Sequence, residues 1–186
     1  IVHAVSHDSI PLVASINVLL SLVYQGFISF YPSYLIDVKG FTTETAATLF
    51  GVFFGASIVV QALAGISRDR FGTKPTLLTI LSLVALGLWV LPLVEGHRQL
   101  VLLTLVLSSL SGYSVITQTF IADTLPDDVT NSALGTLRTC FILIGSISPT
   151  IIGYLGDRGL FSKAFGLLAL VASGGAFLSL FLERTN

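Results

Sequence analysis

The amino-acid sequence predicts an all-α membrane protein with six spanning helices. It is 53% hydrophobic and only 10% charged, with a mean hydropathy of +0.92. A soluble domain of 186 residues could hardly bury so much apolar surface, so lipid must cover the rest. Six segments each reach the roughly 20 residues that a helix needs to cross the hydrocarbon core. They lack the period-two alternation of barrel strands.

The positions of these spans follow from the distribution of charge. An ionised group at mid-bilayer costs about 2.5 to 3.5 kcal/mol, so charges are expected between spans. Only Arg138 among the charged residues lies inside a span. The predicted spans are residues 10–36, 45–66, 75–94, 99–122, 129–155 and 164–182, within one domain at 10–186.

Short linkers separate the spans. A Thr-Thr-Glu run at 42–44 resembles an N-capping cluster before the second span. A polar island at 65–74 joins the second span to the third, and Pro75 suits the first turn of the third helix. Residues 95–98 and 126–128 form the next two linkers. The linkers leave no room for a soluble domain.

One pattern occurs twice, three spans apart. Gly65-x-x-x-Asp69-Arg70 follows the second span, and Gly153-x-x-x-Asp157-Arg158 follows the fifth. Because each span crosses the membrane once, loops three spans apart lie on opposite sides. The pattern therefore predicts two three-helix units related by an inverted repeat.

The polar island resembles the signature loop of the major facilitator superfamily, G-x-x-x-D-R-x-G-x-[KR]. The matching positions are Gly65, Asp69, Arg70, Gly72 and Lys74. The stretch at 149–159 is similar to the junction of the fifth and sixth helices in one half of such a transporter.

The resemblance covers residues 10–182 and implies one half of a twelve-helix transporter. The polar lead at 1–9 looks like the end of the cytoplasmic loop between halves, which implies helices seven to twelve and a missing N-terminal six-helix half as partner. We therefore expect a piece of a longer protein. Against the family pattern, Ser67 replaces a commoner leucine and Thr73 a commoner basic residue.

By this resemblance the polar island, Gly65 and Gly72 included, is a conformational latch. We expect Asp69 to accept backbone N–H groups at a tight turn, and Arg70 or Lys74 to pair with Asp123 at the end of the fourth span. Alternatively, the cations of the island are solvated anchors that fix the topology. Their clustering favours a cytoplasmic position for the island.

Polar residues of the first and fourth spans form stripes at helical spacing. The resemblance implies that these two helices line a central cavity, so the stripes supply candidates for contact with a small solute. The alternative is hydrogen bonding between helices. The candidates are Asn17, Ser21, Tyr24, Gln25, Tyr31, Ser108, Ser111 and Gln118.

Arg138 is a further cavity candidate, about ten residues and roughly 15 Å along the fifth span. One interpretation is that it attracts an anionic group of the solute. The other is structural, with the guanidinium paired with Asp123 or with helix-end carbonyls, and this interpretation is favoured.

Small residues at four-residue spacing predict close helix packing in two spans. Pro149 is also expected to kink the fifth span. The two ladders are Ala47, Gly51 and Gly55 in the second span, and Gly145, Pro149 and Gly153 in the fifth.

No catalytic arrangement is visible, because the acids and histidines lie at ends or linkers, and no metal-spaced His and Cys occur. We therefore expect no enzyme, cofactor or metal. A net charge of −1 gives no reason to expect a nucleic-acid partner.

The sequence favours a multi-pass protein of the plasma (inner) membrane. We expect secondary active or facilitative transport of a small solute by alternating access, with lipid, the solute and the missing half as partners. The alternatives are a complete six-helix channel or membrane-embedded enzyme, and a membrane scaffold.

Overall fold

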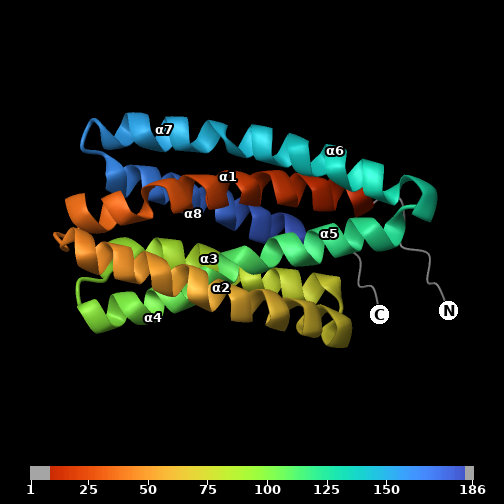
Figure 1. The fold of residues 1–186 in the computed structure, drawn as a ribbon, viewed down its shortest axis with the longest axis horizontal. Coiled ribbons are helices and arrows are strands. Elements are labelled where there is room, and N and C mark those ends of the chain that lie inside the picture. The colour runs from red at the N-terminus through yellow and green to blue at the C-terminus, as the bar shows by residue number, and fades with distance from the viewer. Residues whose placement is uncertain (1–8, 183–186) are drawn as a thin grey trace.

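The computed structural model describes residues 9–182, apart from the side chains of 9 and 127–129, and this part of the chain is an all-helical bundle without strands (Figure 1). Its helices form six segments long and apolar enough to cross a membrane, which confirms the all-α, six-span prediction. The elements are α1 (Ser9–Asp37), α2 (Thr43–Phe71), α3 (Thr73–Val90), the 3-10 helix η1 (Leu91–Leu93), α4 (His97–Leu107), the 3-10 helix η2 (Ser108–Ser111), α5 (Gly112–Thr124), α6 (Asp127–Gly145), α7 (Ile147–Gly156) and α8 (Phe161–Ser179).

Helix α2 extends beyond its predicted end. Thr42 caps its start, where the hydroxyl oxygen accepts the N–H of Thr45 at 3.3 Å. The helix runs to Phe71, so most of the polar island is helical. Gly72 then adopts a φ of 88° and donates its N–H to the Arg68 carbonyl at 2.8 Å. Because glycine tolerates positive φ without a steric penalty, α3 can begin at the next residue.

The fourth span is interrupted near its middle, where the sequence predicts one continuous helix. Helix α4 ends at Leu107, and η2 leads into α5. The hydroxyl of Ser108 donates to the Leu105 carbonyl at 2.6 Å, and that of Ser111 donates to the Ser108 carbonyl at 2.8 Å. Serine hydroxyls that bond to nearby carbonyls compete with the regular helical pattern. A run of serines therefore accompanies a tighter turn.

The fifth span is interrupted at Ser146, between α6 and α7. Pro149 has no N–H to donate to the carbonyl four residues earlier, which belongs to Gly145, and its ring crowds that carbonyl. Helix α6 ends at Gly145. The expected disturbance from Pro149 thus falls one turn before the proline.

The spans pack in a pattern that relates the two triplets. Helix α2 packs on the fourth span (α4, η2 and α5), and the fifth span (α6 and α7) packs on α1. Helices α3 and α8, the last of each triplet, pack on each other. Figure 1 places the α2–α3 junction and the α7–α8 junction at opposite ends of the bundle. This arrangement is the one an inverted repeat produces.

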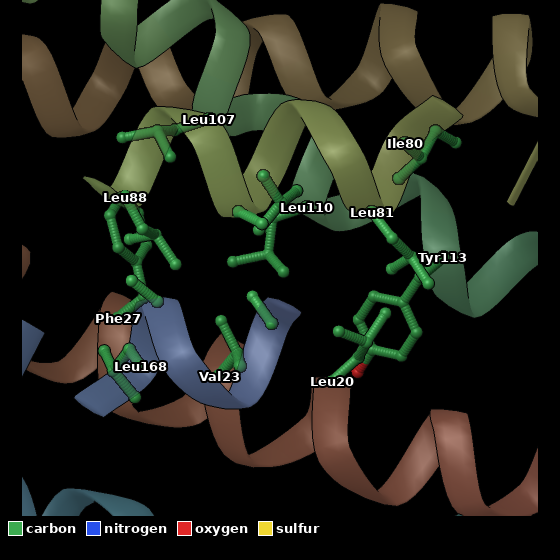
Figure 2. Close-up of a cluster of buried hydrophobic side chains, with 14 of the residues drawn as sticks. Leu20, Val23, Phe27, Ile80, Leu81, Leu88, Leu107, Leu110, Tyr113 and Leu168 are labelled. Atoms are coloured by element: carbon green, nitrogen blue, oxygen red, sulfur yellow. The ribbon is translucent and has the colours of Figure 1, made fainter. Parts of the chain in front are cut away.

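The core lies between α1, α3, the fourth span and α8. Figure 2 shows side chains of α1 and α8 facing those of α3, α4 and η2. The rings of Phe27 and Tyr31 stack with centroids 4.5 Å apart, and both side chains are fully buried. Such contacts join residues one helical turn apart within the buried core.

Close approach between α1 and the fifth span depends on glycine. A Cβ at Gly26 would lie 2.4 Å from the Ser148 Oγ, and one at Gly145 would lie 3.1 Å from the Ser21 carbonyl oxygen. A Cβ at Gly153 would meet the Phe30 ring at 2.9 Å. The predicted close packing is therefore present at the glycines of the fifth-span ladder.

The ladder in α2 behaves differently. Ala47, Gly51 and Gly55 are exposed, and a Cβ at either glycine would meet nothing within 4 Å. The prediction of close packing at this ladder is therefore wrong within the described chain, because no helix of residues 9–182 covers that face.

Candidate functional site

A cavity of about 340 Å³ lies among four of the six spans. Ten of its twelve lining residues carry a hydroxyl, amide or guanidinium group, which is unusual inside a bundle this apolar. The lining residues are Asn17, Ser21, Tyr24, Gln25, Gln61, Ser111, Tyr113, Ser114, Gln118, Arg138, Phe141 and Ile142.

Each wall of the cavity contributes a long polar side chain. Gln25 comes from α1, Gln61 from α2, Gln118 from α5 and Arg138 from α6. Amide and guanidinium groups at membrane depth are costly unless they meet water, one another or a ligand. The four walls thus converge on a space suited to a polar molecule.

Seven of the predicted cavity candidates line this cavity, whereas Tyr31 and Ser108 do not. Tyr31 is fully buried, and its hydroxyl bonds to the Thr104 Oγ1 at 2.5 Å. It shares a face with Tyr24 but lies about 10 Å further along α1, because seven residues rise 1.5 Å each. Ser108 is also fully buried. A stripe of polar residues at helical spacing predicts which side of a helix borders the cavity. It does not predict how far along the helix axis the cavity extends.

Hydrogen bonds join several of the residues that line the cavity. The Asn17 Nδ2 donates to the Thr117 Oγ1 at 2.5 Å, and the Ser21 hydroxyl donates to the Asn17 Oδ1 at 3.3 Å. The hydroxyls of Ser21 and Tyr113 also lie 3.3 Å apart. The sequence left two roles open for these polar residues, lining the cavity and joining helices. Asn17 and Ser21 do both.

We expect Tyr31→Phe to weaken the bundle slightly. Hydrogen bonds between membrane helices contribute about 0.6 kcal/mol on average. Thr104 keeps a partner, because its hydroxyl also donates to the Leu100 carbonyl at 2.7 Å. The melting temperature in detergent should fall slightly. A large fall in the melting temperature would contradict so small a contribution.

Five lining residues were not predicted. Gln61 is an isolated amide within an uncharged span, which is a signal that the sequence analysis could have used. Tyr113 and Ser114 follow the η2 turn, which shifts the face that α5 presents. Phe141 and Ile142 are apolar, and nothing in the sequence separates them from lipid-facing residues.

Arg138 lines the cavity and is exposed on α6. Its favoured structural interpretation requires Asp123 or helix-end carbonyls as partners. Among the described residues, however, Asp123 bonds to Arg68, and Arg138 has neither an ion pair nor a hydrogen bond. The structural interpretation therefore has no support among the described residues.

The end of α2 forms a small ionic cluster with the end of α5. The Arg68 Nη2 donates to the Asp123 Oδ2, and the Arg68 Nη1 lies 3.6 Å from the Asp69 Oδ1. The Arg68 side chain is 17% exposed, whereas that of Asp69 is 77% exposed. The predicted partners of Asp123, Arg70 and Lys74, are wrong because Arg68 occupies that position.

The other residues of the island have different contacts. Asp69 lies in the last turn of α2 and accepts no backbone N–H in the described chain, contrary to the prediction for a tight turn. The Lys74 Nζ donates to the Leu180 carbonyl at 2.7 Å, which joins the start of α3 to the end of α8. The Arg70 guanidinium lies 5.4 Å from the centroid of the Phe71 ring. A Cβ at Gly65 would meet nothing within 4 Å.

At the opposite end of the bundle, Lys39 joins the linker after the first span to the end of the third span. Its Nζ donates to the carbonyls of Pro92 at 2.8 Å and Val94 at 2.6 Å. Partial burial lowers the pKa of the Lys39 ammonium from its ordinary value, and the negative charge of Glu95 opposes this shift. These bonds satisfy carbonyls left free at the end of the third span.

No group of three or more His, Cys, Asp or Glu side chains that could hold a metal occurs within residues 9–182 as described. The cavity contains no carboxylate, histidine or cysteine. Its chemistry is that of binding through hydrogen bonds and one positive charge.

Comparisons with known proteins identify a matching family and several relatives. Residues 13–186 match the Major Facilitator Superfamily. The chain is 25% identical over 156 residues to YuxJ, an MFS-type transporter of Bacillus subtilis, covering 83% of this chain and 40% of YuxJ.

Two further relatives have named solutes. OusA of Dickeya dadantii, a glycine betaine/proline/ectoine/pipecolic acid transporter, is 25% identical over 89% of this chain and 34% of its own length. SauU of Cupriavidus necator, a probable sulfoacetate transporter, is 24% identical over 84% of this chain and 39% of its own length.

This chain therefore spans two fifths or less of the length of these relatives. The relatives are transporters and not enzymes, and the six apolar segments make the chain an integral, multi-pass membrane protein. From the match over residues 13–186, the chain belongs to the major facilitator superfamily.

Proposed function

We propose that this chain is the C-terminal six-helix half of a transporter that moves a small polar solute by alternating access. The observation that carries the proposal is the cavity lined by polar residues from four spans. In such transporters the solute binds near the midplane, between two halves that rock around it. The polar walls described above are half of such a binding site.

The surface of this half supports a second half as its partner. In the second and the fifth spans only 22% of the most apolar window is buried, the lowest share among the six. Both spans border the cavity through Gln61 and Arg138. The uncovered ladder at Gly51 and Gly55 would let a helix of the second half approach closely.

The relatives support a small, polar organic solute. Glycine betaine, proline, ectoine, pipecolic acid and sulfoacetate are the compounds in their names. Each is small enough for a site of a few hundred Å³, the size that ligand pockets usually have.

The ionic cluster at the ends of α2 and α5 is proposed as a latch that stabilises one access state. Arg68 joins the two helices through Asp123, and Lys74 joins α3 to α8. The three cations of the 65–74 segment favour placing this end of the bundle in the cytoplasm, and thus the protein in the plasma (inner) membrane.

Cysteine accessibility in the full-length protein tests the proposal. Ser114 in the cavity is replaced by cysteine in a Cys140→Ser background, and a membrane-impermeant maleimide is added to either side of proteoliposomes. Alternating access predicts labelling from both sides, with added solute raising one rate and lowering the other. A channel predicts simultaneous labelling from both sides together with ion conductance. Labelling from one side under all conditions would refute the proposal.

Any dependence of uptake on a pH gradient should survive neutralisation of the acids in this half. A proton relay needs a titratable group at membrane depth. The described carboxylates instead lie at the ends of spans, as Asp69 and Asp123 do. The ratio of uptake with and without a pH gradient is the measurement, which separates coupling from overall rate. Loss of the dependence in one Asp→Asn or Glu→Gln variant would contradict the prediction.

A further inference from the structure

The electrostatic character of the cavity is set by one residue. Arg138 is the only Asp, Glu, Lys, Arg or His among the lining residues, so this half of the site is positively charged. The other polar groups are neutral amides and hydroxyls. A neutral solute would need no guanidinium there.

The guanidinium of Arg138 is left without a negative partner by this half. Asp123, the partner expected from the sequence, bonds to Arg68. The acidic residues at 127–128 precede Arg138 on the same helix by at least ten residues, which is about 15 Å and too far for an ion pair. Arg138 has no ion pair with any other described carboxylate.

An unpaired guanidinium at this depth needs compensation. Arg138 lies eight residues after the first residue of its span, Thr130, or about 12 Å from that end. A charged residue within a span is costly, so a partner from outside this half would stabilise it. That partner is either an acidic side chain of the second half or the solute.

We infer that the solute is a small organic anion, and that Arg138 binds its carboxylate or sulfonate group. The inference rests on the proposed transport function and names the substrate class of that site. A planar guanidinium donates two parallel hydrogen bonds to such an oxyanion, which a lysine cannot reproduce. The amides of Gln25, Gln61 and Gln118 would bind the rest of the molecule through groups that donate or accept.

The amide residues also explain why the single charge of Arg138 suffices to bind such a solute. They surround the cavity from three other spans, so they can recognise polar groups of the solute at several positions without adding charge. An anion bound to Arg138 would leave the cavity of this half electrically neutral. Neutralisation lowers the cost of moving the site through the closed, water-poor state.

The test uses the full-length transporter in nanodiscs, with and without small probes. Propionate, succinate and methanesulfonate are compared with the neutral analogues propionamide and succinamide. The readouts are the melting temperature and the dissociation constant from calorimetry, which need no transport. The variants are Arg138→Gln and Arg138→Lys. Arg158→Gln is the matched control, because it removes the same charge at the exposed Arg158.

We expect at least one anion, and neither amide, to raise the melting temperature of the wild type. Arg138→Gln should weaken binding of that anion at least tenfold, and Arg138→Lys should retain part of the affinity. Arg158→Gln should bind as the wild type does. The ligand-free melting temperature of Arg138→Gln should stay close to that of the wild type.

Three outcomes would overturn the inference. The first is that no anion in the panel binds. The second is that Arg138→Gln binds the anion as tightly as the wild type. The third is a large fall in the ligand-free melting temperature of both Arg138 variants without anion binding, which would assign the guanidinium to an acid of the second half. None of these affects alternating access, which the Ser114 labelling experiment tests separately.

Discussion

Replacing Gly26 by valine should destabilise the protein by about 3 kcal/mol, the upper part of the range for overpacked cores. A Cβ at this position would lie 2.4 Å from the Ser148 Oγ, 3.0 Å from the Leu168 Cδ2 and 3.2 Å from the Ile152 Cγ1. The valine would therefore push α1 away from both α7 and α8. The melting temperature in detergent and the yield of folded protein are the measurements.

Gly174→Val is the matched control. Gly174 lies within α8, and a Cβ there would meet nothing within 4 Å. The same substitution should leave the melting temperature near that of the wild type. A second change, Ser148→Ala, removes the closest atom and should restore part of the stability of Gly26→Val. Equal effects at Gly26 and Gly174 would show that valine acts through helix propensity alone and would contradict the packing argument.

Asp123→Ala should shift the balance between the two access states proposed above by about fivefold. The ion pair with Arg68 is partly exposed, so a contribution of about 1 kcal/mol is reasonable, and each 1.4 kcal/mol corresponds to a factor of ten. The substitution also leaves the Arg68 guanidinium, whose Nε is buried without a partner in the described chain, lacking its carboxylate. Uptake should slow, and labelling of a cysteine at position 114 should change in opposite directions from the two sides.

Asp69→Asn separates the two carboxylates of the cluster. Its side chain is 77% exposed and 3.6 Å from Arg68, so its interaction is largely screened by solvent. We expect a change of less than about twofold, the size typical of weak surface ion pairs. The double variant Arg68→Ala with Asp123→Ala should add little to either single change. A larger effect at Asp69 than at Asp123 would move the latch to a different pair of residues.

The number of spans was predictable because the cost of placing a charge in lipid acts on each residue independently. The interruptions of the fourth and fifth spans could not be predicted from the sequence. The turn at Ser108–Ser111 depends on which carbonyls the serine hydroxyls select, and the break at Ser146 on how the helix adjusts to Pro149. Both are choices between local arrangements of similar energy, and a pattern of polar and apolar residues does not distinguish them.

The candidate site was also predictable only in part. Helical spacing identified the face of α1 that borders the cavity, yet it did not show that Tyr31 lies too far along the helix. The ion pair at Asp123 could not be assigned from sequence either. Successive residues of a helix point about 100° apart, so the partner depends on whether the helix continues through Arg68. It does, as far as Phe71.

The exposed side of α6 carries Cys140, the single cysteine of this sequence. It lies two residues after Arg138 on the span that the second half is proposed to cover. Two residues turn a helix by about 200°, so the thiol faces away from the side of α6 that borders the cavity. Its alkylation rate in the otherwise unaltered protein would report how open that other side of α6 is to a reagent, without a label having to be engineered into the bundle.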